Sequence, residues 1–234
     1  AGAAGLITVI IAIVLSGDFR DSSHSRRDPA RRPGFKADLK LLFSAPALLC
    51  LMFFAFLAAG QLGPQWFADK VYYLAHDVPV LVGNSFISVF VIGIIGGVIA
   101  GGIVADRARD HLKLAFISFF LSGVGMILMG IVSPDSRLIY PLFVATGFLF
   151  GFGFSSRDMV VSSLAPPESS GKVFGFVFSG LDIGAAGIPI VYGYMIGSDR
   201  PLQLFYLAGA LIILAGVSVV VAGRSATARE GLTQ

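Results

Sequence analysis

Residues 82–105 read VGNSFISVFVIGIIGGVIAGGIVA and contain no charged side chain. A helix of this length is about 36 Å long, enough to cross the hydrocarbon core of a bilayer, which is about 30 Å thick. Apolar and polar residues do not alternate along it, which disfavours a strand of a transmembrane barrel. The stretch therefore predicts a membrane-spanning helix, because a helix satisfies its own backbone hydrogen bonds in lipid.

The rest of the 234-residue chain has the same character. Hydrophobic residues make up 56% of the sequence and charged residues 13%, about half of the roughly 25% that is usual in soluble domains. These features predict an all-α, polytopic transmembrane helix bundle in a lipid bilayer. The further predicted spans, the third of which could extend to Val161, are Leu41–Gly60, Leu112–Val132, Leu138–Phe154, Val173–Ile196 and Leu202–Ala222.

The N-terminal run Ala1–Ser16 is also apolar, but it is slightly short for a bilayer span. It has no basic stretch before it and no cleavage site after it, which disfavours a signal peptide. We expect it to be the remaining end of a preceding transmembrane helix. The polar segment 17–40, which contains two prolines, is typical of a flexible linker.

The basic residues predict the orientation of the spans. Of the 17 Lys and Arg residues, only Lys70, Arg137 and Arg200 fall on one side, and the other 14 fall on the opposite side. The basic side faces the cytoplasm in multi-pass proteins. We therefore expect a protein of the cell (inner) membrane with segments 17–40 and 224–234 on the cytoplasmic side. The basic residues of 17–40 could alternatively contact anionic lipid headgroups rather than only set the orientation of the spans. Because the basic residues lie between spans rather than on one face, we expect no nucleic-acid partner.

The sequence contains no set of residues typical of a metal or cofactor site. The histidines, His24, His76 and His111, fall in predicted loops without metal-ligand spacing. Phosphate-loop, nucleophile-elbow and His-Glu-x-x-His sequences are absent. We therefore expect no metal, no cofactor and no enzymatic activity. Cys50 lies inside an apolar run and is expected to be a small core residue.

A short motif, GIVADRAR, begins in the last turn of the span 82–105 and continues into the loop after it. Its characteristic residues are Gly102, Asp106, Arg107 and Arg109. It resembles the loop signature of the major facilitator superfamily, Gly-x-x-x-Asp-Arg followed by Gly and basic residues. Arg109 stands where the family usually has Gly, and the next two residues depart from the basic pattern. The resemblance implies a conformational latch at these four residues, and ordinary interfacial charges are the alternative.

The resemblance covers the whole chain and implies a division into four parts. Segment 1–16 would be the end of helix six, 17–40 the interdomain linker, 41–223 the C-terminal six-helix half and 224–234 a cytoplasmic tail. The implied partner is a preceding N-terminal six-helix half, and the implied activity is transport of a small-molecule substrate by alternating access. Proton coupling is expected, and a looser resemblance to drug exporters suggests efflux of drugs or metabolites.

Glycines recur at every fourth position in two of the spans. Gly93, Gly97 and Gly101 lie in one, and Gly147 and Gly151 lie in another. Small residues at this spacing allow two helices to approach closely. The pattern therefore predicts two close-packing helix faces and carries no information on substrate.

Asp182 lies near the middle of the span Val173–Ile196. A carboxylate at that depth costs at least about 2.5–3.5 kcal/mol, so a functional role is the first hypothesis. It could take up a coupling proton, with burial raising its pKa, or pair with a cationic substrate. A hydrogen bond to a neighbouring helix is the structural alternative.

Six other polar residues are candidates for substrate or proton binding: Arg157, Asp158, Asn84, Ser88, Gln61 and Gln65. The adjacent Arg and Asp could form a gate ion pair or bind an anionic substrate, or they could be interfacial charges that snorkel to water. The other four form two pairs with i, i+4 spacing, so each pair shares one helix face. They could line a transport path or bond to neighbouring helices.

Two other classes of protein remain as alternatives to a transporter. A non-transporting membrane scaffold or receptor would use the charged clusters to recruit partners, and its polar groups would not need to converge on a cavity. An intramembrane enzyme would need a second reactive group at the depth of Asp182. The sequence offers no such group beside it.

Overall fold

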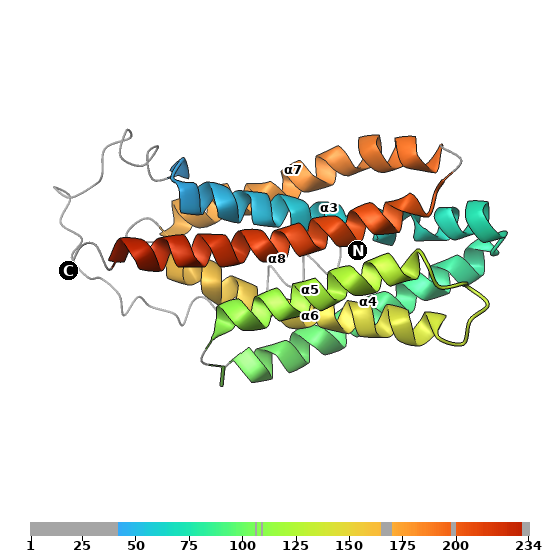
Figure 1. The fold of residues 1–234 in the computed structure, drawn as a ribbon, viewed down its shortest axis with the longest axis horizontal. Coiled ribbons are helices and arrows are strands. Elements are labelled where there is room, and N and C mark those ends of the chain that lie inside the picture. The colour runs from blue at the N-terminus through green and yellow to red at the C-terminus, as the bar shows by residue number, and fades with distance from the viewer. Residues whose placement is uncertain (1–41, 106, 109, 165–169, 198–199, 231–234) are drawn as a thin grey trace, which may run out of the picture. The chain divides into compact units, whose positions relative to one another are not determined.

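The structure is a computed structural model that describes residues 42–230 except 106, 109, 165–169 and 198–199. In this part of the chain, six long helices run along a roughly common axis, and successive helices run in opposite directions (Figure 1). All six are long and apolar enough to cross a membrane. The predicted all-α transmembrane bundle is confirmed, whereas Ala1–Ser16 and the linker 17–40 lie outside the described residues. The helices are α3 (Ala45–His76), α4 (Val80–Ala105), α5 (His111–Met129), α6 (Ile139–Leu164), α7 (Ser170–Ile196) and α8 (Gln203–Glu230).

The first of these helices is longer than the sequence predicts. Its span was expected to end at Gly60, but α3 continues without interruption to His76. Pro64 lies inside the helix, where it removes one backbone hydrogen bond. Lys70, expected in a loop, therefore lies on the last turns of α3. Asp77 caps the end of the helix: its φ of 54° is left-handed, and its N–H donates to carbonyls of the last turn.

Two later helices also extend beyond the predicted spans. The helix α6 passes Arg157 and ends at Leu164, close to the alternative end at Val161. The helix α8 continues to Glu230, so the backbone of residues 224–230 is helical in the segment expected to be a tail. Both extensions lie on the side predicted to be cytoplasmic.

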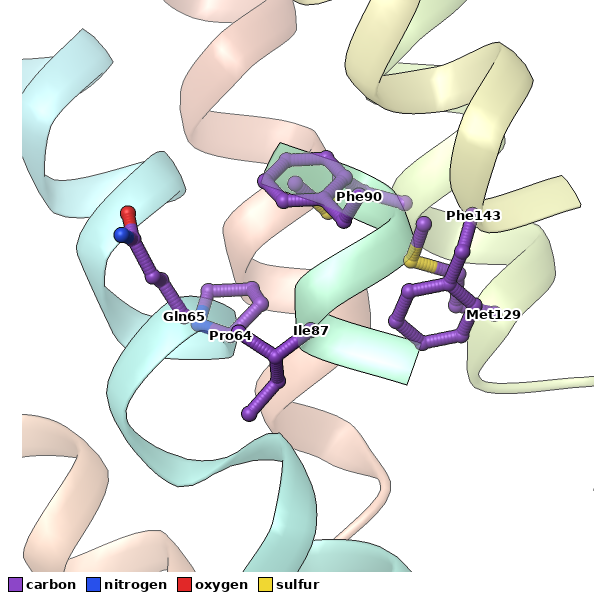
Figure 2. Close-up of a pocket in the computed structure, with 7 residues that line it drawn as sticks. Pro64, Gln65, Ile87, Phe90, Met129 and Phe143 are labelled. Atoms are coloured by element: carbon purple, nitrogen blue, oxygen red, sulfur yellow. The ribbon is translucent and has the colours of Figure 1, made fainter. Parts of the chain in front are cut away.

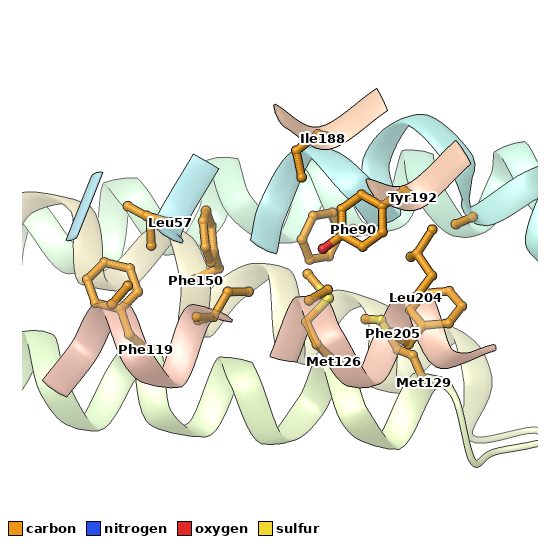
Figure 3. Close-up of a cluster of buried hydrophobic side chains, with 14 of the residues drawn as sticks. Leu57, Phe90, Phe119, Met126, Met129, Phe150, Ile188, Tyr192, Leu204 and Phe205 are labelled. Atoms are coloured by element: carbon orange, nitrogen blue, oxygen red, sulfur yellow. The ribbon is translucent and has the colours of Figure 1, made fainter. Parts of the chain in front are cut away.

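The helices differ in how many neighbours they have. The helices α5 and α8 pack against each other, α6 packs on α5, and α3 packs on α8. By contrast, α4 packs mainly against α6 and α7 mainly against α3. Large buried side chains fill the interior of this arrangement (Figure 3), including Leu57, Phe119, Met126, Phe150 and Phe205.

The glycine pattern of α4 forms a close contact with α6. Gly93, Gly97 and Gly101 are buried, and a Cβ atom on Gly97 would overlap the carbonyl oxygen of Phe148 in α6. Gly151 has the reciprocal role, because a Cβ there would come within 3.0 Å of Ile94 Cα. The predicted close-packing faces are confirmed, and they meet each other.

Tyr72 joins α3 to the end of α5. Its hydroxyl is fully buried and donates a hydrogen bond of 2.7 Å to the carbonyl oxygen of Met129. The last carbonyls of a helix lack partners within it, so this bond satisfies a group that would otherwise be unpaired. Phe86 and Phe205 contact the same ring from α4 and α8.

We expect Tyr72→Phe to lower the free energy of unfolding by about 1–2 kcal/mol, because a buried carbonyl loses its donor. Tyr73→Phe is the matched control, since Tyr73 is the next residue and is half exposed. Thermal unfolding of the full-length protein in detergent measures the difference. Equal stabilities for the two variants would contradict this role of the Tyr72 hydroxyl.

Candidate substrate and proton-coupling site

Asp182 lies on the side of α7 that faces away from α3. Gly180 and Gly184, two residues before and after it, are buried against α3. A Cβ on Gly180 would come within 3.1 Å of Phe54 Cβ, and one on Gly184 within 3.0 Å of Ala58 Cβ. Because residues two apart on a helix point to different faces, Asp182 is directed away from this contact. Its side chain is exposed.

The surface around Asp182 is open. Gly175 and Pro189 lie seven residues before and after it, so they share its face of α7, and both are exposed. A Cβ on Gly175 or on Gly193 would meet no atom within 4 Å. Among the described residues, Asp182 has no hydrogen-bond or ion-pair partner. A group that neutralises this carboxylate at bilayer depth must therefore come from outside the described part of the chain.

Arg157 is in the opposite situation. It lies on α6 and is 9% exposed, although it carries a charge within a membrane-spanning helix. Its Nε donates a hydrogen bond of 2.8 Å to Asp158 Oδ1, and the Asp158 side chain is 53% exposed. The carbon of the guanidinium group, Cζ, lies 4.4 Å from the ring centre of Phe154 and 5.0 Å from that of Phe54. Both distances are within the range of cation–π attraction.

Phe54 connects Arg157 to the helix that carries Asp182. The Phe54 ring packs against Phe178 of α7 in a tilted arrangement, with the ring centres 4.6 Å apart. Arg157 contacts the same ring from α6. The buried guanidinium and the α7 segment next to Asp182 therefore meet at one aromatic side chain of α3, although the ion pair of Arg157 is with Asp158.

Gln61 and Gln65 form the predicted pair on α3. Gln61 Nε2 donates a long hydrogen bond of 3.4 Å to Gln65 Oε1, and both side chains are half-buried. Gln65 lines a small cavity with Pro64 and Ile87 (Figure 2). The cavity volume of about 10 Å³ is at the lower limit for one water molecule. The pair thus lies beside the proline of α3 and next to α4.

Asn84 and Ser88 lie near the beginning of α4 and are exposed. The Ser88 hydroxyl donates to the backbone carbonyl oxygen of Asn84 at 2.9 Å, so the two side chains are not bonded to each other. Further along, the exposed part of α4 is apolar and includes Ile95 and Ile99. The structure therefore does not bring Asn84 or Ser88 into contact with the charged candidates.

The latch motif is described only in part, because Asp106 and Arg109 lie outside the described residues. Arg107 is exposed in the turn that follows α4. A Cβ on Gly102 would meet Ser155 Oγ at 3.8 Å, an ordinary contact, so the close approach of α6 occurs at the other glycines. Asp110, just after the motif, caps α5 by accepting a hydrogen bond of 3.1 Å from the Lys113 N–H, and this bond holds the pKa of its carboxyl below the usual range.

The aromatic surroundings of Arg157 were not predicted from the sequence. Phe154 lies three residues earlier on the same helix, so its proximity could have been inferred from helical spacing. Phe54 and Phe178 belong to other helices, and no sequence pattern connects them to Arg157. Ser156 was also missed: its hydroxyl is buried and has no hydrogen-bond partner among the described residues.

Comparison with known proteins identifies the family of the chain. The sequence profile of the Major Facilitator Superfamily matches residues 1–189 and, in a second match, residues 70–233. The chain belongs to the Major Facilitator Superfamily. The six helices in the described part of the chain that could cross a membrane, together with this membership, support a multi-pass membrane protein of a transporter family. Members of the superfamily are generally carriers rather than enzymes.

A protein of the same superfamily from Aspergillus fumigatus provides a second comparison. It is named an MFS-type transporter and is 25% identical to this chain over 190 residues. The match covers 81% of this chain and 43% of that protein, so the chain spans less than half the length of this relative.

In the described part of the chain, no three His, Cys, Asp or Glu side chains lie together as metal ligands would.

Proposed function

We propose that this chain is the C-terminal half of a secondary active transporter that moves a small solute by alternating access. Family membership supports the transporter class. The open carboxylate of Asp182, at mid-depth on an exposed face of α7, supports a site that faces a second helical bundle. A carboxylate is costly in lipid and is tolerated where it faces a bundle interior or an aqueous path.

The rest of the proposed arrangement follows from the exposed faces of α4 and α7. The N-terminal half would pack against these two helices and enclose the solute path between the halves. The segment 1–16 would end that half, and 17–40 would link the halves on the cytoplasmic side of a cell (inner) membrane. Gly102, Asp106, Arg107 and Arg109 would form the latch that holds one conformation.

We propose that Asp182 carries the coupling proton. A single carboxylate exposed on α7, without a partner among the described residues, can bind a proton from the solute path and release it on the other side. Export of drugs or metabolites is the direction that the looser resemblance favours. Movement of the two halves would then alternate the access of the carboxylate and the solute to each side.

The test is transport by the full-length protein with Asp182→Asn. Cells that lack their major exporters would be assayed for accumulation of a panel of metabolites and antibiotics, with and without an uncoupler. We expect uphill transport to vanish with the uncoupler and to fall to the background of cells without the protein in Asp182→Asn. Exchange of solute between the two sides of the membrane should persist in the variant, because exchange needs no net transfer of a proton.

Asp135→Asn is the matched control, because Asp135 is an exposed carboxylate in the loop between α5 and α6. This variant should transport as the wild type does. Uphill transport that persists in Asp182→Asn would exclude Asp182 as the coupling group. Correct insertion without transport of any solute would instead favour a scaffold or receptor.

A further inference from the structure

We infer that residues 190–196 of α7 form a gate segment, which pivots at Pro189 and which Tyr192 holds closed against α3. The orientation proposed above places this segment at the outer end of α7, beyond Asp182. The inference rests on the proposed transport function and states how the outer side of the solute path opens. Three observations carry it: an exposed proline in α7, the close packing of the inner half of α7 on α3, and one fully buried side chain in the gate segment.

The pivot lies in an uninterrupted helix. The helix α7 continues through Pro189, so the carbonyl of Ala185, four residues earlier, lacks its usual helical hydrogen bond. Pro189 is exposed, and a Cβ atom on Gly187 or Gly193, on either side of it, would meet no atom within 4 Å. Sharp bends of helices occur at prolines. Pro189 therefore weakens α7 at a point where the space around the helix allows it to turn.

The proline of α3 lacks this freedom. Pro64 is buried, and the glycines before it are enclosed by two neighbouring helices. A Cβ on Gly60 would come within 2.6 Å of Ile212 Cγ1 in α8, and one on Gly63 would overlap the Tyr192 ring of α7. Since α3 is confined at its proline and α7 is open at its own, the bend falls on α7.

The inner half of α7 is fixed to α3 by contacts with the α3 backbone. A Cβ on Gly180 would overlap the carbonyl oxygen of Leu51, and one on Gly184 would overlap that of Ala55. Close contacts of this kind at small residues hold membrane helices together. Motion of α7 relative to α3 is therefore expected beyond these glycines, on the outer side of Pro189.

Tyr192 is the one fully buried side chain of the gate segment, all of which the structure describes. It is 0% exposed, whereas Ile190 and Tyr194, two residues before and after it, are 77% and 83% exposed. Met195 and Ile196 are half-buried. Figure 3 shows Tyr192 among the side chains in the interior of the bundle. The hold of α3 on the gate segment therefore depends mainly on this side chain.

The contact of Tyr192 with α3 is one that can be released. Its ring lies in the space that the missing side chain of Gly63 leaves, and its hydroxyl donates a hydrogen bond of 3.2 Å to the carbonyl oxygen of Ala59. An α-helix already pairs this carbonyl with the N–H of Gly63, so the bond from Tyr192 breaks without leaving the carbonyl unpaired. When the ring leaves Gly63, the gate segment turns away from α3 and opens the outer side of the path to Asp182.

The test measures distances between pairs of spin labels in the full-length protein in lipid nanodiscs, by double electron–electron resonance. The labels are attached to cysteines at exposed positions, in a protein whose own cysteines, Cys50 included, are replaced by serine. The outer pair is Tyr194→Cys with Ile131→Cys, just after the end of α5. The inner pair is Ile183→Cys with Ile117→Cys on α5. Both pairs thus report the distance of α7 from α5.

Variants at the contact test the gate. Gly63→Ala fills the space of the Tyr192 ring and should lengthen the mean outer distance by about 3 Å or more, the displacement of a segment about 10 Å long that turns by about 20°. Tyr192→Ala removes the hold itself and should lengthen the outer distance as well. Gly187→Ala is the matched control, because it adds the same methyl group at an open position and should leave the distance unchanged. The inner pair should keep its wild-type distance in all three variants, which also shows that the bundle remains folded.

The outcomes separate this inference from the proposed transport function. An unchanged outer distance in Gly63→Ala and Tyr192→Ala would overturn the inference even if the protein transports a solute uphill. Equal lengthening of the inner and outer distances would also overturn it, because α7 would then move as a rigid rod. Lengthening of the outer distance alone, in a protein that transports no solute, would support the gate segment and count against the transport function.

Discussion

Gly97→Ala is expected to destabilise the helical bundle, whereas Gly96→Ala should leave it unchanged or slightly more stable. A Cβ on Gly97 would overlap the carbonyl oxygen of Phe148 and come within 2.8 Å of the Phe152 backbone nitrogen. These atoms belong to the α6 backbone and cannot move without separating the two helices. On Gly96 the nearest atom would be Phe148 Cδ2 at 3.8 Å, an ordinary contact.

The expected loss for Gly97→Ala is about 1–3 kcal/mol in the free energy of unfolding, as for other overpacked sites. In lipid, helices associate through close packing rather than through exclusion of water, so lost contact is not offset by burial of the new methyl group. The gain for Gly96→Ala is about 0.5–1 kcal/mol, because alanine is the better helix former. Thermal unfolding in detergent measures the stability of both variants, with labelling of the buried Cys50 thiol by a dye as the readout. Equal transitions for the two variants would contradict the close α4–α6 contact.

Phe119→Ala should cause the other large loss of stability. Phe119 is 0% exposed, and its ring contacts Phe53 of α3 and Phe150 of α6 at 5.7 and 5.8 Å between centres. It also lies over Gly153, where a Cβ would come within 2.8 Å of the ring. Figure 3 shows Phe119 and Phe150 in the interior of the bundle, among the side chains between the helices. Removal of the ring would leave a cavity bordered by three helices.

We expect Phe119→Ala to lower the free energy of unfolding by about 3–5 kcal/mol, near the lower end because the unfolded side chain can also reach lipid. Phe120→Ala is the matched control, since Phe120 is the next residue and is 41% exposed. Its loss should stay below about 1 kcal/mol, the size of a contact at the lipid surface. Dye labelling of Cys50 during heating reports both variants. Similar losses for the two would show that the interior at Phe119 is loosely packed.

The sequence alone was sufficient for the features that depend on local composition. Each membrane span is an unbroken apolar run, and a run of that length can satisfy its backbone in lipid only as a helix. The spacing of four residues between Gly93, Gly97 and Gly101 likewise indicated a close-packing face, although it did not indicate which helix packs there. The motif from Gly102 to Arg109 indicated the family, which the profile match shows for most of the chain.

The end of α3 could not be predicted correctly from the sequence. Gln61, Pro64 and Gln65 interrupt the apolar run, and such residues often mark the end of a helix. In the structure Pro64 is buried beside Ile87 of α4, and the helix continues through it (Figure 2). Contacts with neighbouring helices thus override the local signal, as they often do for a proline within a packed transmembrane helix.

The polar candidates were found from the sequence, but the tertiary structure decided which of them meet. Asp182 and Arg157 both stood out as charges within apolar spans. Only the packing of α6 and α7 on α3 placed Arg157 against Phe54 and left Asp182 exposed. Hydropathy is a property of each segment by itself, whereas the contacts of a side chain depend on residues far away in the chain. The sequence therefore determined that these helices cross the membrane, and the packing decided which faces remain open.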